Sequence, residues 1–155
     1  MTVESLLTLH PETLRSLQAL VRANLDSAAA FRECAEVVDD DDLVTRLLGQ
    51  AAERRAGFGE ELATYLSLNE AELPTTGRWL EGLRRIWIDL RARLSGGDTH
   101  VVLVQLERAE EMLRSKYEQV LLATAGSPAN ATLLRHYREI KQTHDAIRVL
   151  ADSSD

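Results

Sequence analysis

The sequence contains a single cysteine, Cys34, among its 155 residues. A redox pair within one chain is therefore excluded, as is a zinc site built from a cluster of Cys and His. The sequence also lacks a Gly-rich phosphate loop and a nucleophile elbow, which are common signatures of enzymes. Because Cys34 lies among small residues at helical spacing, in 28–38, we expect it to be reduced and buried.

The sequence also contains fewer basic than acidic residues. Lys and Arg number 18 against 25 Asp and Glu, which gives a formal net charge of -7. Such a chain is repelled by nucleic-acid phosphates and by anionic membrane surfaces, so neither is an expected partner. Residues 1–14 contain neither a basic segment nor a long apolar run, and we expect no signal peptide, no transmembrane helix and a cytoplasmic location. The length fits one domain, 1–155.

Almost no segment has the alternating pattern of a β-strand, whereas apolar residues recur at helical spacing along most of the chain. The pattern predicts five helices, at about 11–38, 43–67, 77–95, 99–126 and 128–150. Pro11 and Pro128 suit the first turns of the first and last helices, and Gly96 suits the end of the third. The Asp run at 39–42 lacks the Gly and the terminal Glu of a calcium loop, so we expect a turn in which one Asp caps the second helix.

The lengths of these helices predict a topology. Four of them have about 22 to 28 residues, or roughly 33 to 42 Å, whereas the third is near 18 residues and about 27 Å. Short loops make the first two helices antiparallel, and likewise the last two. The third helix must then cross from one end of the bundle to the other, which leaves the second and fourth helices parallel. This is an all-α, ferritin-like four-helix bundle with a fifth, crossover helix between the second and third bundle helices.

Five sequence blocks, in order, are similar to a bacterial ferritin-like family of unassigned function. They are 26–36 (DSAAAFRECAE), 55–62 (RAGFGEEL), 82–87 (GLRRIW), 107–117 (ERAEEMLRSKY) and 143–150 (THDAIRVL). The resemblance implies the four-helix architecture and a bacterial cytoplasmic protein. It implies no established activity.

Two ionisable residues lie within otherwise apolar stripes. Glu110 shares its stripe with Leu103, Leu106, Leu113, Tyr117 and Val120. His144 shares its stripe with Leu133, Tyr137, Ile140, Ile147 and Ala151. Burying such groups is costly unless they are paired, hydrogen-bonded or bound to a metal, so each is predicted to have a partner.

The sequence departs from the usual ferritin-like di-iron centre, which takes a Glu-x-x-His motif from each of two helices. Three residues after Glu61 stands Thr64. Three residues before His144 stands Lys141, and Arg84 occupies a position where the resemblance leads us to expect His. A complete di-iron centre is therefore not expected.

Four candidate metal ligands remain, one on each long helix: Glu36, Glu61, Glu110 and His144. One His with several carboxylates suits a single iron, manganese or zinc ion. The favoured alternative is an internal salt-bridge network, in which basic side chains neutralise the carboxylates. The basic candidates are Arg54, Arg55, Arg85, Lys141 and Arg148.

The other notable residues are expected to have structural roles. Three histidines are predicted to lie at the surface or at helix caps: His10, His100 and His136. Glu107 and Glu111 are expected to be solvated or paired, and Trp79 and Trp87 to pack the third helix against the bundle.

The function we favour at this point is non-enzymatic. Apolar residues surround more than one face of the third helix and make up 45% of the chain, which predicts self-association as a homodimer. The chain is then a self-associating bundle with a buried polar network. The alternative is a metal-binding ferritin-like protein with a reduced, non-standard site and a link to stress.

Overall fold

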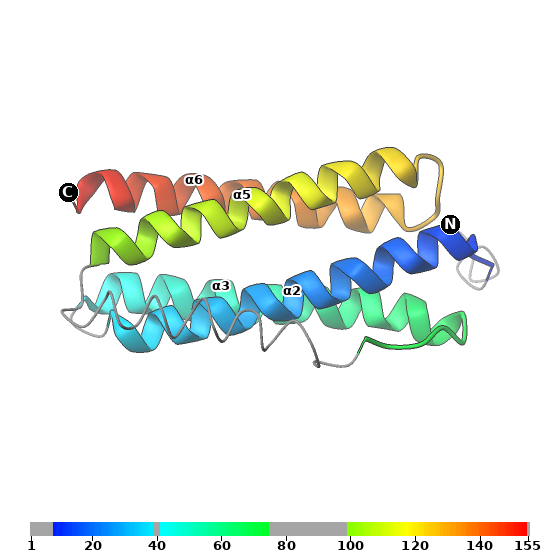
Figure 1. The fold of residues 1–155 in the computed structure, drawn as a ribbon, viewed down its shortest axis with the longest axis horizontal. Coiled ribbons are helices and arrows are strands. Elements are labelled where there is room, and N and C mark those ends of the chain that lie inside the picture. The colour runs from blue at the N-terminus through cyan, green and yellow to red at the C-terminus, as the bar shows by residue number, and fades with distance from the viewer. Residues whose placement is uncertain (1–7, 39–40, 75–98, 155) are drawn as a thin grey trace.

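The computed structural model describes residues 8–38, 41–74 and 99–154, which form four helices and no strand (Figure 1). The helices are α2 (Pro11–Val37), α3 (Asp42–Leu68), α5 (Thr99–Ala123) and α6 (Asn130–Ser153). The predicted all-α class and its four long helices are confirmed. The predicted crossover helix, with Trp79, Trp87 and Arg85, falls outside the described residues.

The four helices pack as two antiparallel hairpins, α2 with α3 and α5 with α6, and α3 and α5 run in the same direction (Figure 1). The end of α3 lies beside the start of α2, because the Leu9 N–H donates to Asn69 Oδ1 at 3.0 Å. The start of α5 lies at the opposite end, where His100 Nδ1 is 2.8 Å from the carbonyl oxygen of Ala151. The end of α3 and the start of α5 therefore lie at opposite ends of the bundle, and the parallel orientation predicted for the second and fourth helices is confirmed.

The helix ends follow from local side chains. Pro11 is in the first turn of α2, and Asp41 caps α3 by accepting from the N–H groups of Leu43 and Val44 at 3.1 and 3.2 Å. Both features agree with the prediction. α5 ends at Ala123, before the predicted Gly126, and α6 begins at Asn130 rather than at 128.

A turn replaces the predicted helix ends between α5 and α6. Gly126 has a φ of 83°, a conformation that favours glycine. Ser127 Oγ accepts from the Ala129 N–H at 3.3 Å, and the Asn130 side chain donates to the Thr124 carbonyl at 3.0 Å. Side-chain hydrogen bonds to nearby backbone groups compete with the backbone hydrogen bonds of a helix, and here they favour the turn between α5 and α6.

The core consists of two apolar clusters, one toward each end of the bundle. The first contains Leu17, Leu20, Val21, Phe58, Leu62, Leu66, Leu113, Val120, Leu133 and Ile140. The second contains Phe31, Cys34, Val44, Leu48, Ala51, Ala52, Val102, Leu103, Leu106 and Ile147. Cys34 is fully buried, as predicted. None of the helices in the described ranges has the length and hydropathy needed to span a membrane.

Candidate functional site: a buried polar layer

A group of hydrogen-bonded polar side chains lies inside the bundle among the apolar clusters; Ser27 is partly buried and the others are buried. We call this group the polar layer: Asn24, Ser27, Arg55, Glu110, Tyr117 and His136. In sequence, these residues fall between or beside cluster members on the same face of each helix. The same apolar spacing that buries the clusters therefore also buries the polar layer.

The centre of the polar layer is an ion pair between α3 and α5. Arg55 and Glu110 have side chains that are 0% and 1% exposed, and Arg55 Nη2 donates to Glu110 Oε2. Glu110 Oε1 accepts from Arg55 Nε at 3.3 Å and from Ser27 Oγ at 3.2 Å. Both carboxylate oxygens therefore accept hydrogen bonds. Through them Glu110 links α5 to α3 by way of Arg55 and to α2 by way of Ser27.

Two aromatic rings enclose the guanidinium of Arg55. Its Cζ lies 5.8 Å from the ring centre of Phe31 and 5.4 Å from that of Phe58. Both distances suit a cation–π contact. The charge of Arg55 is therefore balanced by one carboxylate and by two ring faces, away from bulk solvent.

A hydrogen-bonded chain connects this region with the surface. Asn24 Nδ2 donates to Tyr117 Oη at 2.7 Å, and Tyr117 Oη lies 3.0 Å from His136 Nδ1. His136 Nε2 lies 3.4 Å from Glu61 Oε1, and the second oxygen of Glu61 accepts from Arg135. Because the Glu61 carboxylate only accepts, the proton of His136 lies on Nε2, and Nδ1 accepts from Tyr117.

The surroundings keep Tyr117 and His136, in the middle of this hydrogen-bonded series, uncharged. Burial lowers the pKa of His136 to about 4, although the negative charge of Glu61 partly opposes this shift. Burial also raises the pKa of Tyr117. Burial alone would raise the pKa of Glu61, but the hydrogen bond from Arg135 and the nearby His136 outweigh it and lower the pKa. At neutral pH the imidazole and the phenol are therefore neutral, which agrees with the tautomer assigned from the hydrogen bonds.

The predicted surface position of His136 is wrong. The residue is 0% exposed, and its ring stacks on Phe58 with ring centres 3.9 Å apart. The sequence pattern allowed two choices, because both His136 and Tyr137 lie three or four residues from Leu133 and Ile140. The helix turns His136 fully inward, and Tyr137 is only partly buried.

The four predicted metal ligands do not form one cluster. Glu110 is paired in the core, Glu61 is 41% exposed at the end of the hydrogen-bonded chain, and Glu36 is exposed on α2. His144 lies on α6 beside carboxylates of α5. Among residues 8–38, 41–74 and 99–154, no group of three or more His, Cys, Asp or Glu side chains is arranged to hold a metal ion.

His144 is nearly buried and faces acidic side chains. Its Nε2 lies 3.3 Å from Glu111 Oε2 and 3.7 Å from Glu107 Oε1, and its Nδ1 lies 3.2 Å from Asp145 Oδ1. Arg114 and Arg148 also approach these two glutamates, at 2.6 and 4.0 Å. Glu107 and Glu111 are therefore paired rather than free.

The remaining basic candidates differ in position. Arg54 and Lys141 are exposed, whereas Arg55 is buried against Glu110. Asn24 and Ser27 were not among the site residues predicted from the sequence. Spacing alone did not single out Asn24, because Asn24 and the apolar Leu25 both lie three or four residues from Val21 and Ala28.

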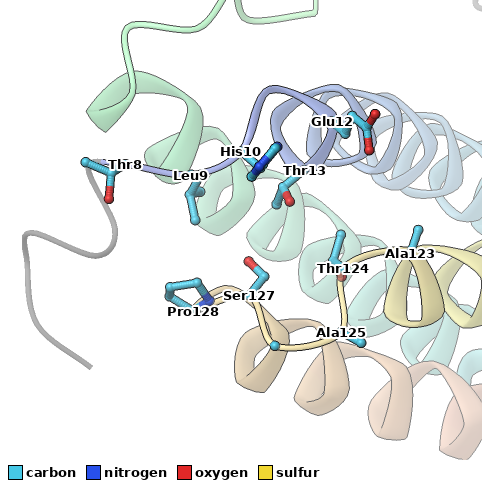
Figure 2. Close-up of a pocket in the computed structure, with 11 residues that line it drawn as sticks. Thr8, Leu9, His10, Glu12, Thr13, Ala123, Thr124, Ala125, Ser127 and Pro128 are labelled. Carbon is cyan, nitrogen blue, oxygen red and sulfur yellow. The ribbon is translucent and has the colours of Figure 1, made fainter.

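A pocket of about 450 Å³ lies at one end of the bundle, between the start of α2 and the turn after α5. Figure 2 shows the hydroxyl groups of Thr13 and Ser127 directed into the space between these segments. His10 and the carboxylate-bearing Glu12 also line it, but no Lys or Arg does. The described lining therefore supplies no Lys or Arg to an anionic ligand, and it does not include residues of the polar layer.

Comparison with known proteins matches the chain to one family model. The family model described as a domain of unknown function, DUF2383, matches residues 12–123 of the 155. The matched region covers most of α2 and all of α3 and α5, and so includes the Arg55–Glu110 pair but not His136. No curated protein matches the chain. The expected resemblance to a family of unassigned function is thus confirmed.

Proposed function

Because the chain belongs to the DUF2383 family, whose description assigns no activity, we propose its function from its own residues: it is a non-enzymatic helical bundle of ferritin-like type, with a structural polar layer. The observation that carries this proposal is the complete pairing of Glu110. Both of its oxygens accept hydrogen bonds from Arg55, and Ser27 supplies a third bond.

The physical role of the pair is to specify how the helices meet. A buried ion pair adds little net stability compared with apolar residues of the same size, because two charges lose their hydration. A shift of α3 past α5 by one turn, however, would leave two buried charges without partners. This cost of several kcal/mol favours a single register of the helices.

The pairing of Glu110 also argues for a bundle that needs no metal. A metal ion bound to Glu110 would displace the guanidinium of Arg55. Arg55 would then remain buried between Phe31 and Phe58 without a counter-ion, at a large cost in free energy. Arg55 thus supplies the positive charge that a metal ion would supply in a ferritin-like centre.

The experiment is elemental analysis of the purified full chain, before and after addition of iron, manganese or zinc and removal of the excess. We expect less than stoichiometric metal in the wild type, and the same result in Glu110→Gln. Glu53→Gln, which removes an exposed carboxylate from α3, is the matched control. Stoichiometric metal in the wild type that is lost in Glu110→Gln but kept in the control would contradict the proposal.

A second candidate function is metal binding at a reduced, non-standard site with a link to stress. The observation in its favour is His144, whose Nε2 faces two carboxylates of α5. His144 and the glutamates would have to close around an iron, manganese or zinc ion. The same elemental analysis distinguishes this candidate from the metal-free bundle, because metal binding requires stoichiometric metal in the wild type and its loss in His144→Ala.

We also propose that the bundle forms a homodimer in a bacterial cytoplasm. Large apolar side chains on α5 and α6 are exposed, including Leu122 at 81%, Met112 at 73% and Val149 at 63%. Exposed apolar area of this kind favours association. The mass in solution, measured by sedimentation over a wide concentration range, should be that of a dimer. A monomer at every concentration would rule the dimer out.

A further inference from the structure

Two atoms of the polar layer are buried without a hydrogen-bond partner: Oδ1 of Asn24 and Nη1 of Arg55. Both residues are 0% exposed. One atom is an acceptor and the other is a donor. Buried polar atoms in folded proteins nearly always have a partner, either in the protein or in an ordered water molecule.

The hydrogen bonds around Asn24 fix the orientation of its amide. Nδ2 donates to the Leu20 carbonyl at 2.9 Å and to Tyr117 Oη at 2.7 Å. Rotating the amide by half a turn would bring Oδ1 against the Leu20 carbonyl, so that two acceptors would face each other. Asn24 Oδ1 is therefore an acceptor that no neighbouring side chain satisfies.

The arginine has one unused nitrogen for a similar reason. Nε and Nη2 of Arg55 both donate to Glu110, which leaves the two hydrogens of Nη1. The flanking rings of Phe31 and Phe58 are apolar and accept no conventional hydrogen bond. Nη1 is therefore a charged donor in need of an oxygen atom.

The two unpartnered atoms belong to facing turns of α2 and α3. A Cβ built on Gly59 would lie 3.3 Å from Leu25 Cδ2 and 3.8 Å from Asn24 Cβ, so this turn of α2 packs against α3 at Gly59. Arg55 lies about one helical turn before Gly59. Its guanidinium reaches the side of α2, because Glu110 Oε1 accepts both from Arg55 Nε at 3.3 Å and from Ser27 Oγ at 3.2 Å. One water molecule with two hydrogen bonds of about 2.8 Å joins atoms up to roughly 5.6 Å apart.

We propose that the polar layer contains a binding site for one internal water molecule, held between Arg55 Nη1 and Asn24 Oδ1. The water oxygen accepts from Nη1, and one water hydrogen is donated to Oδ1. A cation does not suit this site because of the guanidinium, and an anion does not suit it because of the amide oxygen. Water is the ligand that accepts and donates at once.

This inference rests on the proposed structural role of the polar layer, and it completes the hydrogen bonding of that layer. With the water in place, α2 is joined to α3 through this water, as well as through Ser27 and Glu110. The polar layer then contains no unsatisfied atom of Asn24 or Arg55, as a polar network that determines helix register requires.

The test is a crystal structure of the full chain at a resolution that shows ordered water. We expect a water within about 2.7 to 3.2 Å of both Arg55 Nη1 and Asn24 Oδ1. A direct hydrogen bond between these two atoms, or no water at either, would overturn the inference. Metal analysis of the same preparation separates the two proposals, because a missing water in a metal-free protein refutes only the water site.

Nuclear magnetic resonance supplies the matched comparison in solution. Transfer of magnetisation from water to the side-chain N–H groups of Arg55 should be strong in the wild type. It should fall to background in Asn24→Leu, which removes the acceptor at similar volume, and persist in Ser27→Ala, whose lost hydroxyl contacts Glu110 instead. Undiminished transfer in a folded Asn24→Leu would overturn the inference. The wild-type crystal structure decides alone if that variant does not fold.

Discussion

Acidification should weaken the fold through His136, because this imidazole is buried in its neutral form. The pKa of a histidine is about 6.5 in an unfolded chain, and burial lowers the pKa of His136 to about 4 in the folded one. Between these two values the unfolded chain binds a proton that the folded chain does not. The contribution of His136 to stability is therefore fully present above pH 6.5 and is lost as the pH falls toward 4.

The size of this effect follows from the shift. A shift from 6.5 to about 4 corresponds to about 3 kcal/mol at 1.36 kcal/mol for each pKa unit. Linkage gives a loss of about 2 kcal/mol between pH 7 and pH 5. The side chain is 0% exposed, so solvent screening reduces this figure little.

The assay is urea unfolding at pH 7 and pH 5, followed by circular dichroism. In His136→Gln, whose amide still has a donor and an acceptor for Glu61 and Tyr117, the loss of unfolding free energy between the two pH values should be smaller by about 2 kcal/mol. His10→Gln, which replaces an exposed histidine, should behave as the wild type. An equal loss in the wild type and in His136→Gln would refute the reasoning.

Three further predictions concern single residues on α2 and α3. Burial raises the pKa of Asp26 to about 6, so its ionised form destabilises the fold at pH 7, and Asp26→Asn should raise the unfolding free energy there by about 1 kcal/mol after allowance for solvent screening, as measured by urea unfolding. Burial also raises the pKa of the Cys34 thiol, which should react with a thiol reagent only at the rate of unfolding; immediate reaction in the native protein would contradict its burial. Asp41→Ala removes the cap of α3 and should lower the unfolding free energy by about 1 kcal/mol, whereas an unchanged value would show that the cap contributes nothing.

The sequence was sufficient to predict the four described helices and most of their buried positions. Apolar spacing identified the stripe of Glu110, and every member of that stripe is buried. It also predicted that Glu110 needs a partner, and Arg55 was among the candidates. The choice of Arg55 depends on how α3 is rotated against α5, and side-chain spacing within one helix does not contain that information.

The errors have local physical causes. Each residue of a helix is rotated by about 100° from the previous one, so neighbouring positions can fit one stripe equally well at a single turn. His136 and Tyr137 were such a pair. Glu36 was predicted as a candidate ligand, whereas the buried face of α2 passes through Asn24 and Phe31 and leaves Glu36 exposed.

If Arg55 and Glu110 act as one structural unit, a double-mutant cycle of unfolding free energies measures the coupling between them. Arg55→Met and Glu110→Leu should each lower the unfolding free energy by about 3 to 5 kcal/mol, because each leaves one buried charge without its partner. The double variant should lose far less than either single one, since it buries no charge. Losses that simply add in the double variant would contradict the account.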